Sequence, residues 1–402
     1  MKILHIISQK PSDTGSGLYI RNLIKEFKKR GHKQSILCGV ENLNESELGI
    51  DEVKSYPVIF NTKKLPFNIV GMSDVMPYNS TRYRDLDKDM LYKFKCEFEN
   101  TIVQAINEFK PDVILCNHLY LVTALTVDIA KKIKVYGICH GTDLRQLKSH
   151  NLEKKFIMNN LKKLSGVFVL HNDQKEDLIK NFNIDKEKII VSGIGYDDSI
   201  FYNKNLKKSK KINIVYTGKL CYSKGVRCLI NAYSSLELNK NEVCLNIIGD
   251  GCNEEKKHII KLAEKSQLTI NFLGRLTQHQ LSHVYNKSHI FVLPSFYEGL
   301  PLVLVEALSS GMYVISSELN GVKNWFGDNI NNSGRIEYVE LPKMKSLDEP
   351  CESGIEEYED RLKKSIIKTI SKVKNSKDYN EIDTQELTWS GLSKVIEKNI
   401  DL

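Results

Sequence analysis

The sequence lacks any apolar run long enough to cross a bilayer. A transmembrane helix needs roughly 20 predominantly apolar residues, and no stretch of this 402-residue chain approaches that length. The opening segment MKILHIISQK also lacks the long apolar core of a signal peptide. We therefore expect a cytoplasmic protein, and peripheral contact with the inner face of the cell membrane stays open.

Paired cysteines are absent as well. The nine cysteines are scattered, their number is odd, and none form a C-x-x-C pair. Several, such as Cys116 and Cys139, lie in apolar, strand-like runs. This usage is typical of reduced thiols in the cytosol, and we expect no disulfide framework.

The sequence has only a small excess of charge of one sign. The formal net charge is +8, and the basic excess is spread thinly along the chain. A dedicated nucleic-acid binder usually concentrates its basic residues on one face or arm. We therefore expect no nucleic-acid partner, whereas small anionic ligands suit this charge.

Several catalytic signatures are incomplete. Ile20 stands where a G-x-G-x-x-G dinucleotide fingerprint needs its third glycine. No Walker lysine follows a glycine loop, and no D-x-D pair stands where a divalent cation would be expected. His279 and His283 are four residues apart, but no third zinc ligand is evident, so solvated histidines are the favoured interpretation. The absence of these motif residues argues against a nicotinamide dehydrogenase, a P-loop enzyme and a zinc site.

The chain does contain two successive runs of alternating strand and helix patterns. Its length exceeds that of a typical single core, which favours two domains. KILHII, an amphipathic helix and KQSILCGV open a parallel α/β sheet. We predict domains at 1–200 and 212–384, a polar linker at 201–211 and a C-terminal helix in 385–402. Residues 336–380 are charged and weakly patterned.

The segment SFYEGLPLVLVEALSSG is mostly apolar, yet it carries Glu298 and Glu306. Buried carboxylates need partners to offset their desolvation. The segment follows an apolar strand, Pro301 suits the first turn of a helix, and Gly311 suits its end. The helix start would offer free N–H groups to a phosphate, and Glu306 could accept hydrogen bonds from a ribose diol. Two surface glutamates on an amphipathic helix are the plain alternative.

Two lysines follow the first strand behind the linker. Lys219 and Lys224 lie in YTGKLCYSKGV. Cations at a strand end can neutralise a diphosphate leaving group, on which negative charge builds in the transition state. For either lysine alone, a solvated surface position is the alternative.

Together these segments resemble GT4-type glycosyltransferases with the GT-B fold. Glu298-x7-Glu306, with its flanking strand and Gly311, matches the E-x7-E signature of that family. Lys219 departs from the usual Gly-Arg and loses the bidentate fork of arginine. The resemblance implies an α/β fold with two tandem Rossmann-like domains, whose parallel sheets face a central cleft. It also implies that the C-terminal helix returns to the N-terminal domain.

The resemblance assigns roles to individual residues. The catalytic set would be His140, Glu298, Lys219 and Lys224. On the acceptor side the candidates are Asp143, which could also cap a helix, and Arg145. No metal ligand is expected. Residues expected to contact the donor are Gly15, Gly17, Gly249, Arg275, Leu276, Gly299, Leu300, Pro301 and Glu306.

Two further segments are open to two interpretations each. The polar-aromatic insertion 71–86 is either an acceptor-recognition element or a surface loop. The segment 152–164 has lysines beside apolar residues and could rest on an anionic leaflet, although a core-facing amphipathic helix is favoured.

The implied reaction is the transfer of a sugar from a nucleotide-diphosphate donor, such as a UDP- or GDP-sugar. The acceptor would be a glycan, a lipid-linked sugar or a small molecule. The resemblance implies retention of the anomeric configuration without a metal or other cofactor. The alternatives are a sugar-nucleotide epimerase and a catalytically idle GT-B protein that binds nucleotide.

Overall fold

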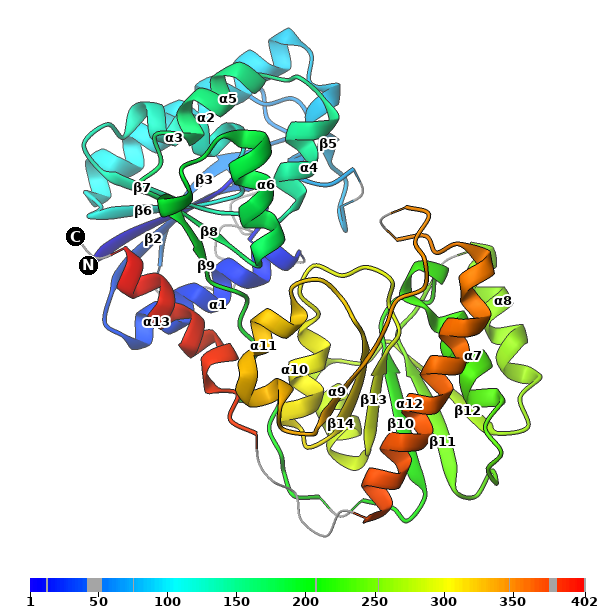
Figure 1. Cartoon of the computed structure of the whole chain (residues 1–402). Coiled ribbons are helices and arrows are strands. Elements are labelled where there is room, and N and C mark those ends of the chain that lie inside the picture. Colours follow the sequence, from blue (N-terminus) through cyan, green and yellow to red (C-terminus); the bar gives the residue numbers. More distant parts are fainter. Residues whose placement is uncertain are drawn as a thin grey trace. The chain divides into compact units, whose positions relative to one another are not determined.

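The chain divides into two compact units (Figure 1). Unit 1 consists of Met1–Ile194 and Trp389–Leu402, and unit 2 consists of Gly195–Thr388. The predicted segments 201–211, 336–380 and 71–86 each include residues outside the described ranges. The computed structural model describes residues 1–11, 14–41, 53–74, 76–206, 208–251, 253–346, 348–375 and 382–400.

Unit 1 is built around a seven-stranded sheet with the order β3-β2-β1-β6-β7-β8-β9. Every neighbouring pair is parallel, and the strand order reverses between β1 and β6. The strands are β1 (Lys2–Ile7), β2 (Lys33–Val40), β3 (Lys54–Ile59), β6 (Val113–Asn117), β7 (Lys134–Ile138), β8 (Gly166–Val169) and β9 (Ile189–Val191). A separate short pair is formed by β4 (Val70–Gly71) and β5 (Thr81–Arg82).

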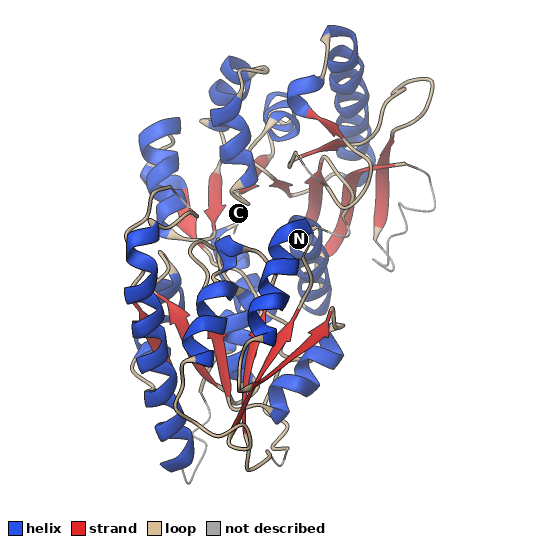
Figure 2. Ribbon diagram, turned by 90° about the vertical axis from the view of Figure 1, so that its right-hand side faces the viewer, coloured by secondary structure: helices blue, strands red, loops and turns tan. Residues whose placement is uncertain are grey.

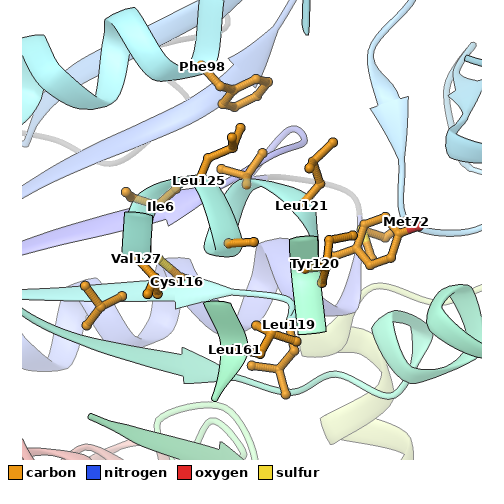
Figure 3. Packing of buried hydrophobic residues seen from close by; sticks show 14 of the residues in the cluster. Ile6, Met72, Phe98, Cys116, Leu119, Tyr120, Leu121, Leu125, Val127 and Leu161 are labelled. Atoms are coloured by element: carbon orange, nitrogen blue, oxygen red, sulfur yellow. The ribbon is translucent and has the colours of Figure 1, made fainter. Parts of the chain in front are cut away.

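Helices cover both faces of this sheet (Figure 2). They are α1 (Gly15–Lys29), α2 (Lys88–Phe109), α3 (Leu121–Ile129), α4 (Thr142–Ser149), α5 (Lys154–Leu161), α6 (Asn172–Phe182) and α13 (Trp389–Asn399). Successive residues of β1 enter different clusters, because successive side chains of a strand point to opposite faces. Ile6 packs in the cluster that contains Phe98 of α2 and Leu125 of α3 (Figure 3). Ile3 packs on the other face with residues of α1 and α13.

The C-terminal helix α13 belongs to unit 1, which confirms the predicted return to the N-terminal domain. Its Ile396 is fully buried in one cluster with Tyr19 of α1. Glu397 adds polar contacts, because its carboxylate lies 2.9 Å from Arg30 Nη1 and 2.8 Å from His32 Nε2.

Unit 2 repeats the same architecture with six parallel strands in the order β12-β11-β10-β13-β14-β15. The order reverses between β10 and β13. Its strands are β10 (Ile212–Thr217), β11 (Val243–Ile248), β12 (Thr269–Gly274), β13 (Ile290–Leu293), β14 (Tyr313–Ser317) and β15 (Ile336–Val339). Its helices are α7 (Val226–Ser234), α8 (Asn253–Glu264), α9 (Gln278–Lys287), α10 (Leu302–Ser309), α11 (Val322–Asn331) and α12 (Ile355–Asn375).

Among the described residues, five 3-10 helices complete the secondary structure. Of these, η4 follows β10 and contains Lys224, and η6 precedes the return of the chain to unit 1. The five are η2 (Tyr83–Asp85), η3 (Lys186–Lys188), η4 (Tyr222–Lys224), η5 (Glu352–Gly354) and η6 (Gln385–Leu387). In the described ranges, no helix is both long enough and apolar enough to cross a membrane.

The chain crosses between the units earlier than the predicted linker at 201–211. Unit 2 already begins at Gly195. Phe201 is fully buried there, with its ring centroid 6.0 Å from that of Tyr285. Burial of Phe201 and the hydrogen bonds of Asn286 with Tyr202 and Lys204 fix a segment whose polar composition suggested a free linker.

The structure has regular elements in residues 336–380, where the sequence suggested only a weak pattern. This segment contains β15 and the 21-residue helix α12. The apolar positions of α12 recur at helical spacing, but charged residues between them conceal the pattern. Its buried residues are Ile355, Tyr358, Leu362, Ile366, Thr369 and Ile370.

Candidate functional site

Two glycines hold the strand ends of unit 2 unusually close together. Gly225 has φ +65°, and a Cβ there would lie 1.9 Å from the Pro294 carbonyl oxygen. Gly249 has φ +127°, and a Cβ there would lie 2.0 Å from the Gly218 carbonyl oxygen. Any larger residue would force these loops apart. The loops after β10, β11 and β13 therefore meet where the strand order reverses, which is where wound sheets bind ligands.

Glu298 is held in place by two side chains. Lys224 Nζ lies 2.8 Å from Glu298 Oε1, and Ser295 Oγ donates to the same oxygen at 2.9 Å. Lys224 also donates to the Tyr297 carbonyl at 3.2 Å. The side chains of Lys224 and Glu298 remain 27% and 21% exposed. The predicted cation and carboxylate are thus brought together, and the second carboxylate oxygen has no partner among the described residues.

Lys219 differs from Lys224, although both follow β10. Its side chain is exposed and forms no ion pair with any residue that the structure describes. It lines a pocket of about 710 Å³ together with Tyr222, Arg227 and Phe296. Lys224 is therefore fixed by Glu298, whereas Lys219 lines a pocket that also contains the carboxylates of Glu254, Glu255 and Glu352.

Glu306 lies inside α10 and is 7% exposed. No described residue donates a hydrogen bond to its carboxylate. Burial, and after it the negative charge of Asp197, raises the pKa of Glu306 from 4.5 to about 8. A buried carboxyl group without protein donors is suited to receive donors from a ligand.

The loop before α10 leaves backbone donors open. Pro301 is the N-cap residue, so the helix begins at Leu302, one residue after the predicted start. Gly311 has φ +85° and ends the helix as predicted. Gly299 is exposed, and no described residue accepts from the N–H of Gly299 or Leu300. These donors lie at the positive end of the helix dipole.

The remaining predicted donor contacts lie at the ends of β11 and β12. Gly249 donates to the Gly274 carbonyl at 2.8 Å, which joins these two strand ends. The Arg275 side chain is 83% exposed, with its Nε 3.7 Å from Asp250 Oδ2. Leu276 packs partly against the apolar cluster under α10.

In unit 1 the two predicted glycines, Gly15 and Gly17, lie in the first turn of α1 and differ in their surroundings. Gly15 is exposed, and an added Cβ would meet nothing within 4 Å. The N–H of Gly17 donates to Thr14 Oγ1 at 3.0 Å, because Thr14 is the N-cap of α1. The N–H of Gly17 thus serves the helix cap, and contact of Gly15 and Gly17 with the donor stays a prediction. The preceding Ser12 and Asp13 lie outside the described residues.

His140 follows β7, and its ring is enclosed on three sides. Nε2 lies 2.9 Å from Asn117 Oδ1. The ring centroid lies 4.7 Å from that of His118 and 5.1 Å from that of Tyr19. Burial, and after it the neighbouring His118, lowers the pKa of His140 to about 3. The imidazole is therefore neutral at physiological pH.

Asp143 is enclosed by backbone donors within unit 1, and its contact with an acceptor stays a prediction. It is fully buried, and its carboxylate accepts from Leu119 N at 2.8 Å, Leu144 N at 3.1 Å and His140 N at 3.3 Å. The N-cap of α4 is Gly141, and Asp143 lies in the first turn of that helix, where it accepts from Leu144 N. Asp143 also ties the loop after β6 to the loop after β7. Arg145, by contrast, is exposed on α4.

The insertion 71–86 packs onto loops at the carboxyl edge of the unit 1 sheet. Met72 N donates to Gln9 Oε1 at 3.1 Å, and Gln146 Nε2 donates to the Met72 carbonyl at 3.1 Å. Tyr83 of the insertion is fully buried. The described part of the insertion therefore contacts the loop after β1 and helix α4. In the segment 152–164, Ile157 and Leu161 of α5 are buried, as a core-facing helix requires.

Three polar residues of these sites were missed from the sequence. Ser295 positions Glu298, Asn117 contacts His140, and His118 packs beside it. Asn117 and His118 directly follow the apolar run VILC, and Ser295 follows VLP. Polar residues at the end of a buried strand were the available signal.

Two family models match successive parts of the chain. Residues 14–199 match Glycosyltransferase Family 4, and residues 197–349 match Glycosyl transferases group 1. The chain belongs to the GT4-type glycosyltransferases. Its E-x7-E element lies within the second match and includes the Glu298 and Glu306 described above.

Curated relatives match part of this GT4-type chain. An uncharacterized glycosyltransferase of Methanocaldococcus jannaschii is 25% identical over 41% of the chain and 45% of its own length. A UDP-Gal:alpha-D-GlcNAc-diphosphoundecaprenol alpha-1,3-galactosyltransferase of Escherichia coli is 32% identical over 39% of the chain and 44% of its own length. The chain thus aligns with less than half of the length of these relatives.

The fold is shared with solved structures. The Anabaena protein HepE, in complex with UDP and glucose, superposes with a TM-score of 0.64. The match covers 100% of this chain and 99% of HepE at 15% sequence identity. This similarity confirms the predicted GT-B fold class.

Proposed function

We propose that this protein transfers a sugar from a nucleotide-diphosphate donor to an acceptor hydroxyl. The observation that carries the proposal is the Lys224–Glu298–Ser295 network beside the open N–H groups before α10. A fixed carboxylate suits sugar hydroxyls, and cations with N–H groups suit a diphosphate. Both lie where the strand order of unit 2 reverses.

The donor diphosphate would be held by Lys219, Lys224 and the N–H groups of Gly299 and Leu300. In the proposed reaction the bond between the anomeric carbon and the phosphate oxygen breaks, and the acceptor oxygen bonds to that carbon. The acceptor proton passes to the departing phosphate oxygen. The two lysines would stabilise the charge that develops there, so no metal is required. Attack on the same face gives retention of configuration.

The nucleoside would be recognised through Glu306. Glu306 is mostly protonated at pH 7 in the free protein because its pKa is raised to about 8, and it would ionise when two ribose hydroxyls donate to it. Gly249, Arg275 and Leu276, at the ends of β11 and β12, would line the base. The UDP complex of HepE supports a uridine donor, because HepE shares this fold.

Unit 1 would present the acceptor hydroxyl. His140 offers a neutral ring there, while Gly15 and Arg145 remain exposed. The lipid diphosphate sugar in the name of the Escherichia coli relative supports a lipid-linked acceptor. Such an acceptor would bring the protein to the cytoplasmic face of a membrane as a peripheral enzyme.

A transfer assay tests the proposal. UDP- and GDP-hexoses are supplied with and without undecaprenyl-diphosphate-linked sugars, and nucleoside diphosphate release and product are measured. We expect transfer that survives EDTA, with the anomeric configuration retained in the NMR spectrum of the product. Glu298→Gln should lose transfer. Conversion of the donor to an epimer without acceptor would instead indicate an epimerase, and no turnover of any donor would contradict the proposal.

A further inference from the structure

Asn117 occupies a position that the predicted site did not include. It ends β6, next to the reversal of strand order in unit 1, and is 4% exposed. Its Oδ1 lies 2.9 Å from His140 Nε2, and its Nδ2 has no hydrogen-bond partner among the described residues. An amide oxygen only accepts hydrogen bonds, so the nitrogen that faces it must carry the proton.

The opposite nitrogen of His140 is then left with a lone pair. No described residue contacts Nδ1 within hydrogen-bond distance, and the residue is half-buried rather than closed off. A neutral imidazole protonated at Nε2 presents Nδ1 as an acceptor. A ring in this state accepts a hydrogen bond from a neutral hydroxyl group and has no positive charge to attract an anion.

The groups packed around the ring keep it neutral. His118 and Tyr19 are the titratable neighbours that face it, and both are buried and uncharged. Asp143 is the one nearby acid that raises the pKa of the ring, and its effect is smaller than those of burial and His118. Its oxygens are occupied by the backbone N–H groups named above.

The backbone of His118 fixes the arrangement. Its φ of +73° lies in the left-handed region, which is uncommon for a non-glycine residue. Its N–H donates to the Ile138 carbonyl at 2.9 Å, and its carbonyl accepts from Tyr120 N at 3.0 Å. These bonds hold a strained residue in place, so its ring stays beside His140.

We propose that Asn117 is a positioning residue that holds His140 as the Nε2–H tautomer, so that Nδ1 accepts a hydrogen bond from a substrate hydroxyl. The inference rests on the proposed function for the identity of that hydroxyl, which belongs to the acceptor or to the donor sugar. The tautomer itself is a property of the free protein and is tested without any substrate.

The direct test is ¹⁵N NMR of the histidine rings in the full-length protein. The resonance that disappears in His140→Gln identifies His140. We expect its Nε2 to carry the proton and Nδ1 to be unprotonated at pH 7, and we expect this preference to weaken in Asn117→Ala. A proton on Nδ1 in the wild type would overturn the proposal, whatever the enzyme assay shows.

Asn117→Asp supplies a second test through the pH profile. A carboxylate next to Nε2–H favours the imidazolium and raises the pKa of His140. Below the raised pKa, Nδ1 is protonated and cannot accept, so the rate should fall about tenfold per pH unit on the acid side. Asn160→Asp, at another buried amide of unit 1, should keep the wild-type profile. An identical profile in Asn117→Asp and the wild type would contradict the positioning role.

Two replacements of His140, each assayed with and without acceptor, identify the hydroxyl group that donates to Nδ1. An asparagine amide oxygen can occupy the place of Nδ1, whereas a glutamine amide reaches the place of Nε2. His140→Asn should therefore retain at least tenfold more activity than His140→Gln. A defect in transfer alone assigns the hydroxyl to the acceptor, and an equal defect in acceptor-free donor hydrolysis assigns it to the donor sugar. Equal activity of the two variants would contradict a role for Nδ1.

Discussion

Lys224 and Glu298 form an ion pair whose stabilising effect is small. Both side chains are about a quarter exposed, and pairs this open to solvent contribute roughly 0–1 kcal/mol. The pair is better understood as a means of orienting Glu298 and of placing one cation beside the helix start. Its loss should therefore affect turnover far more than stability.

Replacing Lys224 with Met tests this expectation. Removing one preorganised cation from a developing phosphate charge should lower kcat by about 100-fold. The matched control is Lys372→Met, since Lys372 is 32% exposed and also paired, with Glu337. Its kcat should stay within about twofold of the wild type. Equal losses in the two variants would show that Lys224 has no special role.

Glu306→Gln should stabilise the protein only at high pH. Folding raises the pKa of Glu306 from 4.5 to about 8. Between these pH values the unfolded chain carries the ionised group and the folded protein keeps it protonated, so the free energy of unfolding falls as the pH rises. Glutamine does not ionise. The variant should match the wild type near pH 5 and exceed its unfolding free energy by on the order of 3–5 kcal/mol above pH 8. Urea unfolding at the two pH values measures this, and a pH-independent difference would contradict it.

At the scale of single residues, the sequence predicted local patterns well. The E-x7-E spacing placed both glutamates beside one helix, because that spacing is contained in a single loop and helix. The partners of Asp143 could not be predicted in the same way. One of its donors, Leu119, lies 24 residues away on another loop, and burial of Asp143 depends on how those loops fold together.

At the scale of elements, the close approach of the strand ends makes Gly249 hard to replace. In Gly249→Ala the new Cβ would lie 2.0 Å from a backbone oxygen in addition to the strain of φ +127°. Gly274→Ala is the control, because it has φ +68° but nothing within 4 Å. We expect a loss of about 1–2 kcal/mol for Gly274→Ala and at least about 3 kcal/mol for Gly249→Ala. Similar losses by urea unfolding would show that the loops can relax.

Elements with regular apolar runs were predictable, and α12 was not. Its 21 residues carry a one-sided apolar stripe among many Lys and Glu residues. A helix that covers a sheet with only one face is charged elsewhere, and its composition alone resembles that of a loop. The 3.6-residue period, rather than the charge, was the informative feature.

At the scale of the whole molecule, α13 completes unit 1 from the far end of the chain. Ile396→Ala should destabilise unit 1 by about 2–4 kcal/mol, because a fully buried side chain leaves a cavity. Hydrogen exchange should accelerate in peptides from β1 and α1. The exposed Ile367 of α12, 45% accessible, supplies the control Ile367→Ala. Unchanged exchange in unit 1 would mean that α13 is dispensable.

The alternation of strands and helices was sufficient to predict two tandem parallel sheets. The residue at which the chain passes from unit 1 to unit 2 was not predictable, because it depends on tertiary contacts such as the burial of Phe201 in the core of unit 2. Composition identifies a polar stretch, whereas burial of Phe201 and hydrogen bonds such as Lys204 N to Asn286 Oδ1 tie that stretch to unit 2.

The central claim is that unit 2 binds a nucleoside diphosphate through Lys224, the loop before α10 and Glu306. Calorimetric titration of UDP and GDP into the wild type, Lys224→Met and Glu306→Gln tests it most directly. We predict that one of the two nucleotides binds, that both substitutions weaken it at least tenfold, and that Lys372→Met leaves it unchanged. Absence of binding by either nucleotide, or binding that is insensitive to both substitutions, would contradict the claim.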